Sequence, residues 1–256
     1  MHFGLHFSSE HIDELSLRDQ TIVVLDVLRA GTSIAAALAN GAKEIIPVNT
    51  VERAVKISGS LFGDHILRGG ERNGRTIEGF DLGNSPLEYT RERVEGKAII
   101  YSTTNGSRAI DKARYAREVA VGAFVNLSSL LGFLRESGRD AVILCSGNNG
   151  RFSMEDSVCA GMLLHLLSQD SGRELSMTDA ALAAVALYKS FGKSIPRMIK
   201  DSEHGRYLAS LGFDADLEYC AKVDSLTILP QLVGNVVKLK PEKAAIVQKA
   251  HTVKAG

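Results

Sequence analysis

The stretch TIVVLDVLRAGTSIAAALANGAKEIIPV, residues 21–48, decides the fold class of this chain. Its apolar, β-branched beginning, Thr21 to Asp26, is typical of a buried strand. A predicted helix follows over Thr32 to Asn40 and stops at Gly41, a common residue just beyond a helix C-terminus. Glu44 to Val48 is the next predicted strand. A strand, a helix and a second strand in this order indicate a parallel pair joined by a crossover helix.

The same alternation continues along the chain. Further buried strands are predicted at Lys97 to Ser102, Glu118 to Gly122 and Asp140 to Cys145. Helices are expected to begin near Ser107, Asn126 and Ser153. We therefore predict an α/β fold with a mostly parallel sheet covered by helices on both faces. It forms one domain over residues 1–256, with a more helical part from about residue 155.

Two regions depart from this alternation. Leu226 to Leu229 and Asn235 to Leu239 are expected to be late, antiparallel strands at an edge of the sheet. Leu61 to Pro86 is polar and punctuated by glycine, so it is predicted to be a long connecting loop. Loops of this length inside a compact domain are often functional.

Composition limits the class of protein. The 30 basic residues balance 30 acidic ones, which is not the strongly basic charge expected of a nucleic-acid-binding protein. The 3 cysteines form neither a zinc-binding pair nor a disulfide framework. The N-terminus does not resemble a signal peptide, and no apolar run is long enough to cross a membrane. A soluble, cytoplasmic protein is expected, and its oligomeric state stays open.

Polar side chains follow the first predicted strand. Asp26 could hold a metal ion or act as a nucleophile, and Arg29 has a planar fork that suits phosphate or sulfonate oxygens. Thr32 or Ser33 could cap the following helix, whose N-terminus favours an anion. In the alternative interpretation, Asp26 bonds only loop N–H groups and Arg29 pairs with Asp26. The residues alone do not separate the two.

A second polar cluster, Ser102-Thr103-Thr104-Asn105-Gly106-Ser107, follows a later strand. Its hydroxyl groups could donate hydrogen bonds to an anion, and Gly106 permits a close approach of the backbone. An ordinary helix N-cap is the alternative, but it requires only one of these residues. The density of small donors favours an anion-binding loop.

A third cluster runs from Cys145 to Asp156. Cys145 and Arg151 have the spacing of a cysteine-phosphatase loop, in which a thiolate attacks phosphorus and an Arg holds the oxygens. A structural Cys at the end of a buried strand is the favoured interpretation. Ser153 and Asp156 have the spacing of a capping box, whereas Glu155 and Asp156 form an acidic pair that could bind a divalent cation.

The long connection adds oxygen ligands of the kind that Mg²⁺ accepts, namely Glu71, Asp81 and Asn84. Because Mg²⁺ takes only one or two protein carboxylates, not all of the candidate acids can be ligands. The 7 histidines occur in no metal-ligand or triad signature, so most are expected to be structural or to lie on the surface. The sequence also contains no phosphate loop, dinucleotide fingerprint or nucleophile elbow.

At these residues the chain resembles the 2-phosphosulfolactate phosphatase family. The similarity includes VVLDVLRAGTSIAAALANGAKEIIPV from Val23, GGERNG from Gly69, GFDLGNSP from Gly79, GKAIIYSTTNGSRAI from Gly96, GAFVN from Gly122 and CSGNNGRFSMEDSVCAG from Cys145. A looser match begins at Gly205. These segments cover most of the chain in order. Gly31 stands where the family pattern has Thr, which removes one hydroxyl group beside Thr32.

The resemblance implies a three-layer α/β/α sandwich with a mixed sheet and a Mg²⁺-dependent phosphatase. Its substrate would be 2-phospho-3-sulfolactate or a related 2-phospho-hydroxyacid. In methanogens this reaction belongs to coenzyme M biosynthesis. Asp26, Glu155 and Asp156 are predicted to bind the metal, and Asp26 and Asp81 to act in catalysis. The predicted substrate-binding residues are Arg29, Thr32, Arg72, Asn84, Ser102, Thr103, Thr104, Asn105, Gly106 and Asn149.

Two other classes compete with this hypothesis. One is a metal-independent cysteine phosphatase that uses Cys145 and Arg151. The other is a non-catalytic protein in which the same loops bind an anionic metabolite. The number of acidic residues beside the anion-binding loops argues against a pure binding protein.

Overall fold

The fold is described from a computed structural model, which covers residues 1–60, 65–169 and 175–239. These residues form one 11-stranded sheet in the order β5-β4-β6-β3-β11-β10-β7-β2-β8-β1-β9. The strands are β1 His2–His6, β2 Thr21–Leu25, β3 Glu44–Pro47, β4 Ile66–Arg72, β5 Arg75–Thr76, β6 Ala98–Ser102, β7 Glu118–Gly122, β8 Ala141–Cys145, β9 Ser176–Met177, β10 Pro230–Val233 and β11 Val236–Leu239.

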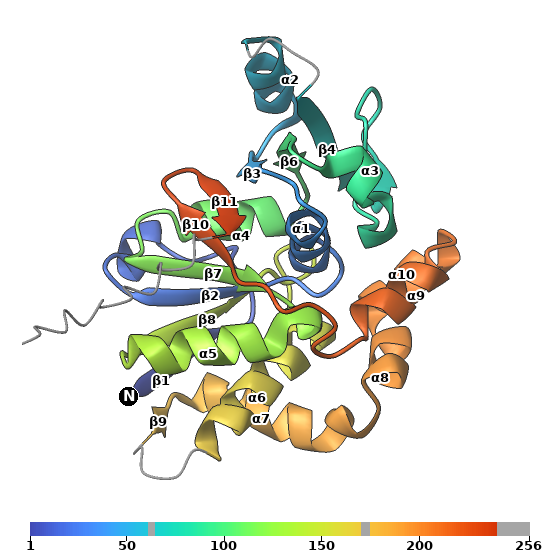
Figure 1. Cartoon of the computed structure of the whole chain (residues 1–256). Coiled ribbons are helices and arrows are strands. Elements are labelled where there is room, and N and C mark those ends of the chain that lie inside the picture. Colours follow the sequence, from blue (N-terminus) through green and yellow to red (C-terminus); the bar gives the residue numbers. More distant parts are fainter. Residues whose placement is uncertain (61–64, 170–174, 240–256) are drawn as a thin grey trace, which may run out of the picture.

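Helices cover both faces of this sheet, as Figure 1 shows. They are α1 Ala30–Ala39, α2 Val51–Ser60, α3 Arg91–Val94, α4 Gly106–Lys112, α5 Leu127–Ser137, α6 Met154–Ser168, α7 Asp179–Phe191, α8 Ile195–Asp201, α9 Glu203–Ser210 and α10 Asp214–Cys220. The predicted α/β fold is confirmed, and so is the three-layer arrangement that the family resemblance implied.

Alternating side chains of each strand pack against different helices, because neighbouring residues of a strand face opposite sides of the sheet. Ile22 and Val24 of β2 belong to an apolar cluster with α1 and α4, whereas Val23 and Leu25 join a cluster with α5 and α6. In β6, Ile100 packs with residues of α2 on the outer face. The buried strand predicted at residues 21–26 is therefore covered on both sides.

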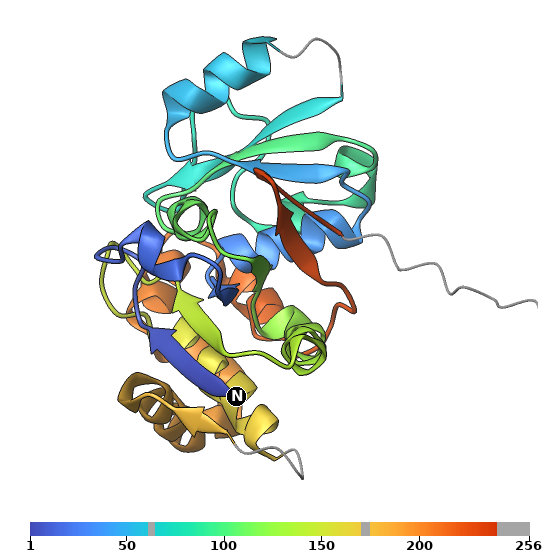
Figure 2. The ribbon, with the colours of Figure 1, turned by 90° about the vertical axis from the view of Figure 1, so that its left-hand side faces the viewer.

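The sheet consists of two parallel blocks. Strands β4, β6 and β3 form one block, and β7, β2, β8, β1 and β9 form the other. The β10–β11 hairpin lies between them and pairs antiparallel with β7 on one side and β3 on the other. Figures 1 and 2 show the hairpin between the two blocks, with α1 also lying between them.

The prediction that the late strands lie at an edge is therefore wrong. The first of them also begins later than predicted, at Pro230 rather than at Leu226. The physical reason is that β3 and β7 each leave a row of unpaired backbone groups on the side facing the other block, and the hairpin pairs with both.

The region predicted as a loop over residues 61–86 contains strand β4 and the short strand β5. The sequence does not reveal β4 as a strand, because Gly70 stands beside β6 where a buried strand usually has a β-branched residue. Gly70 has φ 140°, and a Cβ there would lie 2.0 Å from the carbonyl oxygen of Ser102. Only glycine fits this pairing, so the usual composition of a buried strand is absent. Residues 61–64 of the predicted loop lie outside the described residues.

Candidate active site

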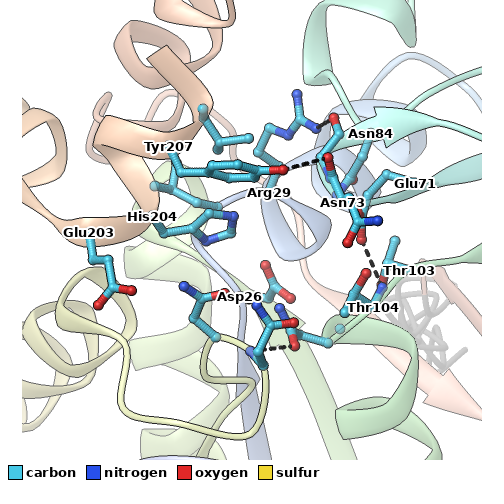
Figure 3. A pocket seen from close by; sticks show the side chains of 17 residues that line it. Asp26, Arg29, Glu71, Asn73, Asn84, Thr103, Thr104, Glu203, His204 and Tyr207 are labelled. Atoms are coloured by element: carbon cyan, nitrogen blue, oxygen red, sulfur yellow. Dashed lines mark hydrogen bonds between the residues drawn. The ribbon is translucent and has the colours of Figure 1, made fainter. Parts of the chain in front are cut away.

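A pocket of about 340 Å³ lies where loops from both parallel blocks meet helix α9 (Figure 3). It is lined by Asp26, Leu28, Arg29, Glu71, Asn73, Gly74, Asn84, Thr103, Thr104, Asn105, Gly106, Asn148, Asn149, Glu203, His204, Tyr207 and Leu208. The strand-end loops thus supply most of the lining, as the sequence predicted, and α9 supplies a wall that the sequence did not predict.

Asp26 lies directly after β2 and is only 5% exposed. One carboxylate oxygen, Oδ1, accepts a hydrogen bond from the N–H of Ala30 at 2.9 Å, which holds the carboxylate at the start of α1. A Cβ on Gly106 would lie 2.6 Å from Oδ2, so a glycine is needed where α4 begins. Burial raises the pKa of Asp26 to about 6, although the charge of His204 acts in the opposite direction.

Arg29 also lines the pocket, but its partner is not Asp26. Its Nη1 donates to Oδ2 of Asp216 at 2.6 Å, and its Nη2 donates to the carbonyl oxygen of Gly74 at 2.6 Å. Its guanidinium lies 4.2 Å from the centroid of the Phe213 ring. The alternative interpretation is therefore wrong in pairing Arg29 with Asp26, although Asp26 does accept a bond from a backbone N–H group, as that interpretation expected.

Glu71 is the second buried carboxylate in the pocket wall. Its Oε1 accepts from the N–H of Thr104 at 2.7 Å, and its Oε2 accepts from the N–H of Gly74 at 2.9 Å. These bonds tie the turn after β4 to the loop after β6. Because its charge acts to raise the pKa of Asp26, the two carboxylates influence each other across the pocket.

The loop after β6 lines the pocket with fewer free donors than its sequence suggested. Ser102 Oγ accepts from Arg72 Nη2 at 2.9 Å, and Thr103 Oγ1 lies 3.0 Å from Ser107 Oγ. Thr104 Oγ1 is buried and has no partner among the described residues. Most of these hydroxyl groups therefore stabilise the loop itself, whereas Thr104 keeps an unused one.

Asparagines close another side of the pocket. The side-chain oxygen of Asn105 accepts from the N–H of Asn149 at 3.0 Å, so the loops after β6 and β8 are joined at the pocket. Asn84 lines the pocket as predicted, with its side-chain oxygen accepting from the hydroxyl group of Tyr101. Asn149 is also in the lining, as predicted.

Glu155 does not line the pocket, whereas His204 does (Figure 3). The carboxylate is 2% exposed, and its Oε1 lies 3.4 Å from His204 Nδ1. Burial acts to raise the pKa of Glu155, but the hydrogen bond and charge of His204 bring it below its ordinary value. The predicted metal ligand is thus a buried partner of a pocket histidine.

Asp156 joins two loops instead of facing a cation. Its Oδ1 accepts from the N–H of Val27 at 2.8 Å, and its Oδ2 accepts from the N–H of Gly147 at 3.1 Å. Burial, followed by the charges of Asp26 and Glu155, raises its pKa well above the ordinary value. The predicted cap is present, since Ser153 Oγ accepts from the N–H of Asp156 at 3.3 Å.

Asp26, Glu155 and Asp156 therefore do not converge as a preformed set of three ligands. In the part of the chain that the structure describes, no group of three or more His, Cys, Asp or Glu side chains is arranged to hold a metal ion. Of the three, Asp26 alone lines the pocket, because the oxygens of the other two are directed at His204 and at backbone N–H groups.

Four other predicted residues lie outside the pocket lining, namely Ser102, whose bond to Arg72 is described above, and Thr32, Arg72 and Asp81. Thr32 is buried and donates to the carbonyl oxygen of Val27 at 2.9 Å. Arg72 bonds the carbonyl oxygens of Glu71 and Ser102, at 2.7 and 3.2 Å, so it stabilises the wall from behind. The side chain of Asp81 is 43% exposed, and its carboxylate accepts from the N–H of Arg68 at 2.8 Å.

The cysteine-phosphatase alternative does not fit this arrangement. Cys145 is fully buried, and burial together with the charges of Asp156 and neighbouring groups raises the pKa of its thiol well above the ordinary value. Neither Cys145 nor the exposed Arg151 lines the pocket. A thiolate nucleophile requires the opposite conditions, with access to solvent and a lowered pKa.

The sequence predicted none of the wall formed by α9, which consists of Glu203, His204, Tyr207 and Leu208. Tyr207 donates its hydroxyl group to the carbonyl oxygen of Asn73 at 3.0 Å, which fastens α9 to the turn after β4. The only signal in the sequence was the looser family match, which begins at Gly205, one residue after His204.

An α/β sandwich with buried carboxylates, an arginine and a histidine around one small pocket defines a protein that binds and processes a small polar molecule. The chain belongs to the 2-phosphosulpholactate phosphatase family, whose sequence model matches residues 6–235. No described helix is both long enough and apolar enough to span a membrane.

Individual relatives agree with this family. The chain is 41% identical over 227 residues to a protein of Caldanaerobacter subterraneus subsp. tengcongensis, covering 89% of this chain and 93% of the relative. It is 39% identical over 237 residues to one of Clostridium acetobutylicum, covering 93% and 100%. It is 41% identical over 221 residues to one of Thermotoga petrophila, covering 86% and 92%. All three are named "Probable 2-phosphosulfolactate phosphatase".

Proposed function

We propose that this protein is a phosphoric monoester hydrolase that converts 2-phosphosulfolactate, or a related 2-phospho-hydroxyacid, to the free hydroxyacid and inorganic phosphate. The family membership supports the reaction. The observation that carries the proposal is that Arg29 and His204 line the same pocket as the buried carboxylates Asp26 and Glu71. This set combines groups that bind an anion with groups that hold a cation.

We further propose that the enzyme uses Mg²⁺. The residues fit such an ion, because Mg²⁺ takes one or two carboxylates and otherwise keeps water, and the pocket lining contains Asp26 and Glu71. An anionic substrate would be repelled by these two buried carboxylates unless a cation also bound there. When bound, Mg²⁺ would neutralise phosphoryl oxygens and stabilise the charge that develops on them during hydrolysis.

The residues of the chain have separate roles in this mechanism. Arg29, whose orientation is fixed by Asp216, donates its free N–H groups to an anionic group of the substrate. The hydroxyl group of Thr104, which has no partner within the described residues, is a further donor. The walls of the pocket would hold the phosphoryl group in one orientation, which favours attack from one direction.

His204 is placed to move a proton. Hydrolysis forms a bond from a water oxygen to phosphorus and breaks the bond from phosphorus to the oxygen on carbon 2 of the substrate. That leaving oxygen requires a proton, which we assign to Nε2 of His204, since Nδ1 faces Glu155 at 3.4 Å. The buried carboxylate of Glu155 lies at Nδ1 and fixes the orientation of the ring.

The experiment is phosphate release from a panel of 2-phospho-hydroxyacids by the wild-type protein, with Mg²⁺ and with EDTA. We expect release from 2-phosphosulfolactate only with the metal. Release that is unchanged in EDTA would contradict the metal proposal. Tight binding of the substrate without release would instead favour a non-catalytic binding protein.

Other features stay predictions. A cytoplasmic location and a role of the reaction in coenzyme M biosynthesis rest on the sequence alone. A homo-oligomer is equally untested, and sedimentation of the purified protein would measure it.

A further inference from the structure

Asp216, in α10, is a buried acid far along the chain from the other site residues. It is 2% exposed, and both of its carboxylate oxygens are engaged. Oδ2 accepts from Arg29 Nη1 at 2.6 Å, and Oδ1 accepts from Ser85 Oγ at 2.6 Å. Asp216 does not line the pocket, so any influence on the substrate must pass through Arg29.

The guanidinium of Arg29 is fixed on three sides. Asp216 holds one nitrogen, and the carbonyl oxygen of Gly74 holds another at 2.6 Å. The ring of Phe213 covers one face, with its centroid 4.2 Å from Cζ of Arg29. Since guanidinium has five N–H donors in a rigid plane, these contacts fix the direction of the remaining donors.

Asp216 is also the carboxylate that the arginine binds, at 2.6 Å. Asp26 precedes Arg29 by three residues in the same loop, and Glu71 shares the turn that contains Gly74. A buried guanidinium needs a nearby negative charge. With Asp216 in that role, Asp26 and Glu71 bond only backbone N–H groups among the contacts described above, and their charge stays available in the pocket.

We propose that Asp216 is a positioning residue for substrate binding, which aims Arg29 at an anionic group of the substrate and prevents Arg29 from neutralising Asp26. The inference rests on the proposed function, because it assigns Arg29 to the substrate. It differs from a purely structural role, in which Asp216 would only help α10 to pack. Leu217 and Cys220 of α10 are themselves buried and can supply that packing.

The test is Asp216→Asn, which keeps the shape of the side chain and removes its charge. We expect KM for 2-phosphosulfolactate to rise about tenfold or more, with a smaller fall in kcat, because a charge-assisted bond that orients Arg29 is lost. Asp214→Asn is the matched control, since Asp214 is exposed in the same helix. It should leave KM unchanged.

A double-mutant cycle separates positioning from packing. If Asp216 acts through Arg29, Asp216→Asn should change KM by less than twofold in an Arg29→Ala background. An equal rise in KM in both backgrounds would overturn the proposal. If Asp216→Asn does not fold, Ser85→Ala removes a bond that holds the carboxylate, and its smaller rise in KM should likewise disappear with Arg29→Ala.

A second probe keeps this test independent of the reaction. Calorimetric titration with inorganic phosphate measures anion binding even if no phosphate is released from any substrate. We expect Asp216→Asn to raise the Kd for phosphate about tenfold in the presence of Arg29 and not in its absence. Failure of turnover alone would contradict the proposed function, whereas an unchanged Kd would contradict the role of Asp216.

Discussion

Two regions form the pocket, and they differ in how they reach it. The strand-end loops place Asp26, Thr104 and Asn105 directly after β2 and β6. Helices α9 and α10 bring His204 and Asp216 from far along the chain. The loops hold groups that face the pocket, and the helices orient those groups or close the pocket. The site at the strand ends is therefore complete only when the later helices pack over it.

The sharpest test of the loop region is Asp26→Asn. We expect kcat with Mg²⁺ to fall about 10³-fold, because the variant loses the buried charge at the centre of the proposed metal site. Phosphate release measures this loss. Asp81→Asn is the control, since the structure directs Asp81 at Arg68, outside the pocket. Comparable losses in both variants would contradict the assignment of the site to the pocket.

The same substitution should stabilise the protein without metal. The pKa of Asp26 is raised from its ordinary value of 3.8 to about 6. Between these pH values the folded state binds more protons than the unfolded state, so the stability falls as pH rises towards 6 and stays lower above it. The shift corresponds to about 3 kcal/mol.

Urea unfolding in EDTA at about pH 4 and about pH 8 measures this effect, because the first lies close to the ordinary pKa of 3.8 and the second above the raised pKa of about 6. Asp26→Asn should gain stability over the wild type at the higher pH and little at the lower. If the wild-type stability does not decline between the two, the carboxylate is not buried as described.

The sequence predicted the loop region well for a physical reason. A buried parallel strand has a composition that identifies it, and its carboxyl end must open toward one edge of the sheet. Asp26, Thr104 and Asn149 could therefore be assigned to a common site. The metal set was wrong in its arrangement because Glu155 and Asp156 are adjacent in a helix, and adjacent helical side chains point in different directions.

The helical region could not be predicted in the same way. Ser202 caps α9 by accepting from the N–H of Gly205 at 3.0 Å, so the start of the helix is local. Which of its faces meets the pocket depends on packing against the rest of the fold. His204 has no sequence motif around it. The contact of Asp216 with Arg29 exists only in the folded chain, so the sequence does not indicate a role for Asp216. The central position of β10 and β11 is equally a property of the assembled sheet.

His204→Asn tests the helical region. We expect kcat for 2-phosphosulfolactate to fall about 10²-fold in this variant, because its leaving group is an alkoxide that must be protonated. With an aryl phosphate, whose leaving group needs no proton, the loss should be at least about tenfold smaller. His11→Gln, at an exposed position, is the control. An equal loss on both substrates would indicate that His204 binds the phosphoryl group instead.

The smallest effect is expected from Cys145→Ala, at the end of β8. The thiol is fully buried and outside the pocket, and burial keeps its pKa well above the ordinary value, so it is protonated and inaccessible at neutral pH. The variant should keep activity within about twofold of the wild type, although the small cavity left by the sulfur lowers the stability by roughly 1 kcal/mol. Alkylation with iodoacetamide should also leave the folded enzyme active. Two results together would assign the chemistry to the loop after β8 and not to the Asp26 loop. They are the loss of phosphate release in a folded Cys145→Ala protein and a wild-type activity that survives EDTA. Cys145 and Arg151 would then be the catalytic residues.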